Sequence, residues 1–110
     1  MFNEPDTARR AEVIAANYAE NVVWHEADGI IRGRKDFERR AEELRAENPD
    51  WVFRPAGDAV DLDDIGHLGF EYGPAGSQPA VTGMDIAHTK DGVIIELYTI
   101  VTAIQPPSPS

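Results

Sequence analysis

Side chains able to carry out proton-transfer chemistry are concentrated between residues 18 and 28. That stretch contains Tyr18, Trp24, His25, Glu26 and Asp28, and a further carboxylic acid, Asp85, lies in a later apolar segment. A carboxyl group buried among apolar side chains has a raised pKa, and two such groups push their pKa values apart. One can then act as a base while the other remains an acid. Glu26 and Asp85 therefore predict acid/base chemistry, provided that both enter one cavity.

Each of these residues also has a structural interpretation. Glu26 could lie in a solvated turn with Asp28, and Asp85 could cap a backbone group. His25 has a near-neutral pKa and could be the base itself or a partner of Glu26. Strand alternation puts Trp24 and Glu26 on one face and His25 on the other. Because Trp24 is the larger apolar group, we expect its face to point inward and His25 to point outward.

Composition disfavours several other classes of site. The formal net charge of −10 would repel nucleic acid. The absence of cysteine excludes disulfides and thiolate metal sites. His67 and His88 lie on predicted strands with no carboxylate at ligand spacing, and His25 would converge with them only by accident of the fold, so we expect no metal site. No glycine-rich phosphate loop precedes a helix, and we expect no cofactor.

The chain also lacks targeting signals. Its N-terminal residues are not a signal peptide, and no apolar run approaches the roughly 20 residues that cross a bilayer. We therefore expect a cytoplasmic protein without membrane association. Abundant alanine, arginine and glycine with little lysine is typical of a GC-rich bacterial genome.

Periodicity and turn residues predict two helices and six strands in one domain, residues 1–104. A stripe formed by Ala11, Ile14 and Tyr18 indicates a first helix with Tyr18 near its end. The predicted helices are 5–19 and 35–48, and the predicted strands are 22–26, 29–32, 51–60 with a bulge or edge at 55–57, 65–72, 80–89 and 93–104. Residues 105–110 are expected to be a disordered Pro/Ser tail. Glu96 is the only charge in the last strand, so we expect both of its faces to be covered, one by the helices and the other by a partner subunit or another element.

Two motifs in this layout resemble the nuclear transport factor 2-like superfamily. They are YAENVVWHEADG at 18–29, with Gly33 before the second helix, and GMDIAHTKDGVIIELY at 83–98. Within the superfamily, the chain is similar to SnoaL-like polyketide cyclases and ketosteroid isomerases. The resemblance implies an α+β, cystatin-like cone, in which a curved mixed or antiparallel sheet wraps around helices. It also implies an apolar pocket at the open end and a homodimer formed through the outer sheet face.

The resemblance also implies roles for individual residues. Glu26 matches the proton-shuttling carboxylate of the isomerases, and Asp85 matches the acid that they keep neutral as a hydrogen-bond donor. Tyr18 matches a supporting tyrosine, and His25 is a further supporting candidate. The pocket is expected to be lined by apolar side chains, namely Trp24, Phe53, Leu68 and Phe70, although aromatic residues such as Phe53 are also common in cores.

One departure leaves the function open. Family members usually begin with a long helix ahead of the one predicted at 5–19, and here that helix is shortened or missing. In the isomerases it carries the main oxyanion-binding tyrosine, which has no match in this chain. The leading hypothesis is a cofactor-free isomerase or cyclase acting on a small apolar carbonyl compound. The alternative is a non-catalytic dimer that binds a ligand or a protein. A misassigned start codon would be a third explanation.

Overall fold

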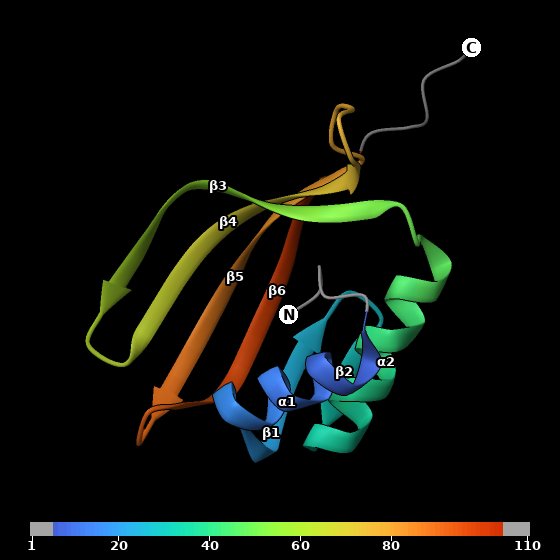
Figure 1. The fold of residues 1–110 in the computed structure, drawn as a ribbon. Helices are drawn as coiled ribbons and strands as arrows, with labels where there is room; N and C mark the ends of the chain where they lie inside the picture. Colours follow the sequence, from blue (N-terminus) through green and yellow to red (C-terminus); the bar gives the residue numbers. More distant parts are fainter. Residues whose placement is uncertain (1–5, 105–110) are drawn as a thin grey trace.

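The structure, a computed structural model, describes residues 6–104 as two helices and six strands (Figure 1). In chain order the elements are α1 (Thr7–Asn17), β1 (Tyr18–Glu26), β2 (Gly29–Arg32), α2 (Arg34–Glu47), β3 (Trp51–Leu62), β4 (Ile65–Pro74), β5 (Val81–Lys90) and β6 (Val93–Ile104). The predicted start of the first helix at Pro5 and the predicted tail at 105–110 lie outside the described residues.

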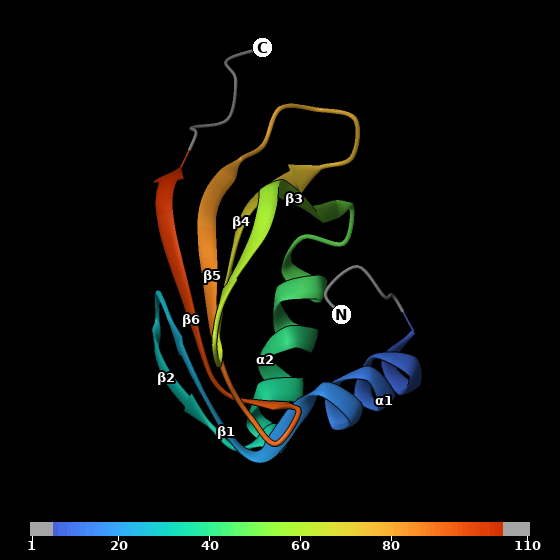
Figure 2. The ribbon, with the colours of Figure 1, turned by 90° about the vertical axis from the view of Figure 1, so that its left-hand side faces the viewer.

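The six strands form one open, mixed sheet in the order β2-β1-β6-β5-β4-β3. Only β1 and β6 run parallel, while the other neighbours are antiparallel. Both helices lie on the same side of the sheet, which curves around α2 (Figure 2). The predicted α+β class, the curved mixed sheet and the four-strand meander after residue 50 are confirmed.

The first helix ends earlier than its apolar stripe predicts. Asp6 caps its start by accepting a hydrogen bond from the Arg9 amide at 3.0 Å. Tyr18 already has extended geometry (φ −121°, ψ 140°) and begins β1, where it pairs with Ile94 of β6. The expectation that Tyr18 ends a helix is therefore wrong. Pairing with a strand distant in sequence decides its conformation, and helical periodicity does not report such pairing.

A glycine sets the entry to the second helix. Gly33 has φ +89°, a conformation that side chains with a Cβ rarely adopt, and its amide donates to the Val22 carbonyl at 2.8 Å. The helix ends at Glu47, with Asn48 as its C-cap directly before Pro49, one residue short of the predicted end. Its two fully buried residues are Phe37 and Ala41.

The edge strand β3 continues beyond its predicted end. A register shift between Ala56 and Val60, with Gly57 at φ +84°, forms the bulge that Pro55–Gly57 predicted. The tight turn between β5 and β6 is also confirmed, with Asp91 and Gly92 both at positive φ.

The buried core fills only part of the space enclosed by the sheet. It is a cluster of five side chains from both helices, β1 and β6, namely Ile14, Val22, Trp24, Phe37 and Leu97. The C-terminal half of α2 faces the strands that curve over it in Figure 1. That part of the concave side contains the cavity described below.

The other face of the sheet carries no helix among residues 6–104 (Figure 2). Ile30 on β2 and Ile100 on β6 are 55% and 45% exposed there. Neither described helix is long and apolar enough to span a membrane.

Candidate active site

The concave side of the sheet encloses a cavity of about 410 Å³. It is lined by side chains from β1, the turn after β1, α2 and all four meander strands: Trp24, Glu26, Ala27, Asp28, Arg40, Leu44, Glu47, Phe53, Phe70, Tyr72, Val81, Asp85, Thr99, Val101 and Ile104. Most of this lining is apolar, and the few polar groups are concentrated around Asp85 and Glu26. A largely apolar cavity with a few convergent polar groups is typical of small-molecule sites.

Strand register decides which side chains enter this cavity. Asp85 pairs with Thr99 on one side and with Leu68 on the other, so all three point to the concave face. Phe70 follows two residues after Leu68 and has the same orientation. Leu68 lies on this face but is not among the residues that line the cavity.

An aromatic wall closes the side of the cavity formed by β3 and β4. Phe53 stacks on Tyr72 with ring centroids 4.1 Å apart and contacts Phe70 at 5.5 Å. Phe70 lies over Gly83, its register partner on β5. A Cβ added at Gly83 would be only 2.8 Å from Phe70 Cζ, so the absence of a side chain at Gly83 leaves room for the Phe70 ring.

Asp85 is connected to Trp24 through the hydroxyl group of Thr99. Trp24 Nε1 donates to Thr99 Oγ1 at 2.9 Å, and Thr99 Oγ1 donates to Asp85 Oδ1 at 2.8 Å. Burial raises the pKa of Asp85, and the hydrogen bond from Thr99 acts in the opposite direction. Burial dominates, so Asp85 holds its proton at a higher pH than an exposed aspartic acid does.

Glu26 is held by an arginine from the second helix. Its Oε1 accepts a hydrogen bond from Arg40 Nε at 3.1 Å, and its Oε2 lies 3.4 Å from the Asp28 amide nitrogen. The same guanidinium binds Asp28 Oδ2 at 2.9 Å and reaches Glu43 and Glu47 at 3.3 and 3.8 Å. The positive charge of Arg40 therefore lies beside the negative charge of the Glu26 carboxylate in the cavity wall.

Tyr18 lies beside the core rather than in the cavity lining. Its ring contacts Phe37 at 4.6 Å. Burial raises the pKa of the Tyr18 phenol to about 12, and the charge of Asp85 contributes in the same direction. The phenol is therefore protonated at neutral pH and sensitive to the charge of Asp85.

His25 lies on the opposite face of the sheet from Trp24 and Glu26. Its ring stacks on Tyr98 at 4.4 Å, and its Nε2 is 3.0 Å from Glu96 Oε2. Tyr98 donates to the same Glu96 oxygen at 2.8 Å. The hydrogen bond from Tyr98, followed by that from His25, lowers the pKa of Glu96. The structure thus separates His25 from the residues around the cavity.

Four polar residues of the cavity were not among the candidates from the sequence, namely Arg40, Glu47, Tyr72 and Thr99. The sequence pattern could have indicated Arg40, because helical spacing places it three residues after Phe37 and four before Leu44, beside the buried stripe. The sequence pattern indicates Thr99 less clearly. This residue alternates with Leu97 and Val101 on the inward face of the last strand, but its pairing with Asp85 depends on an irregular register.

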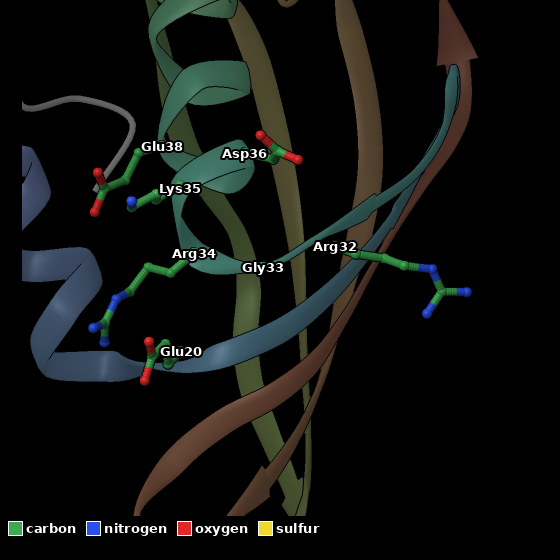
Figure 3. Close-up of a pocket in the computed structure, with 7 residues that line it drawn as sticks. All are labelled: Glu20, Arg32, Gly33, Arg34, Lys35, Asp36 and Glu38. Carbon is green, nitrogen blue, oxygen red and sulfur yellow. The ribbon is translucent and has the colours of Figure 1, made fainter.

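A second cavity, of about 550 Å³, lies at the start of α2. Apart from Gly33, charged side chains line it, and they do not converge: Arg32 and Asp36 point to one side, and the others point toward α1 (Figure 3). Arg34 donates to the backbone carbonyls of Ala15 and Tyr18 at 3.3 Å each, which ties α1 to α2. No apolar side chain of the described residues lines this hollow, so the smaller cavity is the better candidate site for an organic ligand.

No three histidine, aspartate or glutamate side chains come together as metal ligands within the described part of the chain. The polar groups of the cavity are carboxyls, one guanidinium, the hydroxyls of Tyr72 and Thr99, and one indole. Such a set suits hydrogen bonding and proton transfer with an organic ligand.

An open cone with its cavity at the wide end is the architecture of the nuclear transport factor 2-like superfamily. The model of the SnoaL-like domain family matches residues 2–97, and the chain belongs to this family. The resemblance seen in the sequence is confirmed. Among proteins with curated descriptions, none matches the chain by sequence.

Solved structures share the fold at low sequence identity. A "putative isomerase of the SnoaL-like family" from Agrobacterium tumefaciens superimposes with a TM-score of 0.87 at 18% identity, covering 93% of this chain and 88% of that one. A "putative ketosteroid isomerase" from Kribbella flavida gives 0.70 at 20% identity, covering 94% and 74%. A "putative polyketide cyclase" from Sinorhizobium meliloti gives 0.72 at 16%, covering 84% of each chain.

Proposed function

We propose that this protein is a cofactor-free enzyme of the isomerase or cyclase type that moves a proton next to the carbonyl group of a small apolar compound. The proposal rests mainly on one observation: Glu26 and Asp85 line the same apolar cavity in different electrostatic environments. Glu26 forms an ion pair with Arg40, whereas Asp85 has no such partner among residues 6–104 and burial raises its pKa. Different environments for two carboxyls are what acid and base roles require.

In this proposal the Glu26 carboxylate takes a proton from the carbon next to the carbonyl. Neutral Asp85 donates a hydrogen bond to the oxygen of the resulting enolate, and the proton held by Glu26 returns to the ligand at the same or another carbon. The Tyr18 phenol, which stays protonated at neutral pH and senses the charge of Asp85, has a supporting role beside this acid. Positioned acid/base groups of this kind contribute roughly 10²- to 10⁴-fold to rates.

The test measures proton abstraction directly and uses a neutral bicyclic ketone, 2-tetralone, as the probe. We expect the protein to bind it and to accelerate exchange of its α-hydrogens in D₂O, followed by proton NMR. Glu26→Gln and Asp85→Leu should each slow exchange at least about tenfold. His25→Gln is the matched control, because His25 lies on the opposite face and should leave exchange unchanged.

One specific observation supports a second candidate, a non-catalytic ligand-binding module. Both carboxylate oxygens of Glu26 already have partners, Arg40 Nε and the Asp28 amide. A ligand would have to displace one of these two contacts before Glu26 could take a proton from it. Binding of 2-tetralone without accelerated exchange would overturn the enzyme proposal in favour of this one, and absence of binding would contradict both.

We also propose that the protein is a homodimer formed through the outer sheet face. The exposed Ile30 and Ile100 and the absence of a covering helix in the described part support this arrangement. Two identical sheet faces can pack with twofold symmetry, because each presents the same patch to the other.

A further inference from the structure

The two carboxyl oxygens of Asp85 have different surroundings. Oδ1 lies 2.8 Å from Thr99 Oγ1, and Thr99 Oγ1 lies 2.9 Å from Trp24 Nε1. No hydrogen bond joins Oδ2 to another residue in the described part of the chain, and Asp85 contributes to the cavity lining. Oδ2 is therefore the oxygen that is left for a ligand.

The direction of the hydrogen bonds follows from the chemistry of the donors. An indole N–H can only donate, so Thr99 Oγ1 accepts from Trp24. Among residues 6–104, the hydroxyl hydrogen of Thr99 has one acceptor, Asp85 Oδ1. If Asp85 instead donated from Oδ1, the hydroxyl hydrogen would be left without an acceptor in a partly buried site, at a cost of about 1–3 kcal/mol.

We propose that Trp24 and Thr99 confine the acidic proton of Asp85 to Oδ2, which makes Thr99 a positioning residue for the proposed acid. The proton then points toward the ligand, while Oδ1 accepts from Thr99 in both protonation states. No covalent bond forms or breaks at Thr99 or Trp24. The use of this proton in catalysis rests on the proposed function; its placement on Oδ2 does not.

Other charged groups do not provide an alternative way to fix this proton. Tyr18 acts on Asp85 from β1, and the cavity lining adds Glu26 and Asp28 from the β1 end and Arg40 and Glu47 from α2. The direct neighbours on β4 and β6 are the uncharged Leu68 and Thr99. No described lysine, arginine or histidine forms an ion pair with Asp85, and Thr99 is its one hydrogen-bonding partner among these residues.

The sign of one pKa change tests the proposal. A donor that favours the charged carboxylate lowers its pKa, so replacing Thr99 by its isostere in Thr99→Val should raise the pKa of Asp85, by about 0.5–1 unit. Thr99→Ser keeps the hydroxyl and should restore the original value. The measurement is a carbon-13 NMR titration of the Asp85 carboxyl carbon, which needs no substrate. If Asp85 donated to Thr99, Thr99→Val would lower the pKa; a lowered or unchanged value would overturn the proposal.

The hydrogen bond from Trp24 to Thr99 is tested separately. The Trp24 indole N–H resonance should move in Thr99→Val and stay in place in Thr99→Ser, while the Trp51 indole serves as the internal control. In Trp24→Phe the hydroxyl loses its fixed donor and is free to rotate, so the effect of Thr99→Val on the pKa should shrink. An unchanged Trp24 resonance in Thr99→Val would contradict the chain of hydrogen bonds, even if Trp24→Phe fails to fold.

Failure of this proposal is distinguishable from failure of the proposed function. A raised pKa in Thr99→Val, with no α-hydrogen exchange by the unsubstituted protein, would keep the proton placement and reject the enzyme. Exchange that depends on Asp85, combined with a lowered or unchanged pKa in Thr99→Val, would keep the enzyme and reject the proton placement.

Discussion

Arg40 Nε lies 3.1 Å from Glu26 Oε1, and both side chains are largely buried, at 17% and 11% exposure. The same guanidinium also forms ion pairs with Asp28, Glu43 and Glu47. An arginine surrounded by four carboxylates offsets part of their negative charge at one wall of the cavity. It also ties the second helix to the end of the first strand, the two elements that hold Glu26 in place.

Removal of Arg40 should therefore cost more stability than removal of an ordinary surface arginine. Arg40→Gln leaves Glu26 buried beside other carboxylates without a compensating charge, and we expect a loss of about 3 kcal/mol in the free energy of unfolding. Urea denaturation measures it. Arg39→Gln is the control, because Arg39 is 70% exposed and, among residues 6–104, pairs only with Asp36, so its effect should stay within about 0.5 kcal/mol. Equal losses in the two variants would contradict a structural role for the Arg40 cluster.

The raised pKa of Asp85 predicts a pH dependence of stability. The folded state binds the Asp85 proton more tightly than the unfolded chain, so this residue favours folding at low pH. Its contribution is complete below the unfolded pKa, near 3.9, and is lost as pH rises through the higher folded value. Asp85→Asn has no such proton and still accepts from Thr99. The free energy of unfolding of Asp85→Asn relative to the unsubstituted protein should therefore increase between pH 4 and 7, and a constant difference would show that the pKa is not raised.

The charge of the cavity predicts selection against anionic ligands. Glu26, Asp28 and Glu47 face a single cation, Arg40, so the wall is negative even when Asp85 is neutral. We expect neutral 2-acetylnaphthalene to bind at least about tenfold more tightly than 2-naphthoate, which has a similar size and one negative charge. Isothermal titration calorimetry measures both affinities. The difference should narrow in high salt, and equal affinities at low salt would contradict electrostatic selection.

The proposed dimer predicts the effect of a charge on the outer sheet face. Ile100→Glu places a carboxylate on the outer sheet face at an exposed apolar position, so the dimer should dissociate to a monomer in light scattering coupled to gel filtration. Val13→Glu is the control, because Val13 is similarly exposed, at 38%, but lies on the first helix. A protein that is monomeric without any substitution, or an Ile100→Glu variant that stays dimeric, would exclude this interface.

The amino-acid sequence determined most of the architecture, because it depends on local patterns. Alternation and turn residues predict the last strand at 93–104, and these are its actual bounds. Pro49, which disfavours helical geometry in the residue before it, predicts where the second helix ends. The motifs around Tyr18 and Asp85 were enough to indicate the family. Alternation in the first strand also gave the separation of Glu26 from His25, since neighbouring residues in a strand point to opposite faces.

Tertiary structure alone decided the partners of the two carboxyls. A regular hairpin with a two-residue turn at Asp91–Gly92 would place Tyr98 opposite Asp85. Instead, one extra residue, Ile95, shifts the register, so that Thr99 pairs with Asp85 and enters the cavity beside it. Likewise, Arg40 reaches Glu26 only because the second helix crosses the end of the first strand. Neither contact follows from local periodicity, because a bulge and a helix-to-sheet crossing depend on packing between residues far apart in the chain.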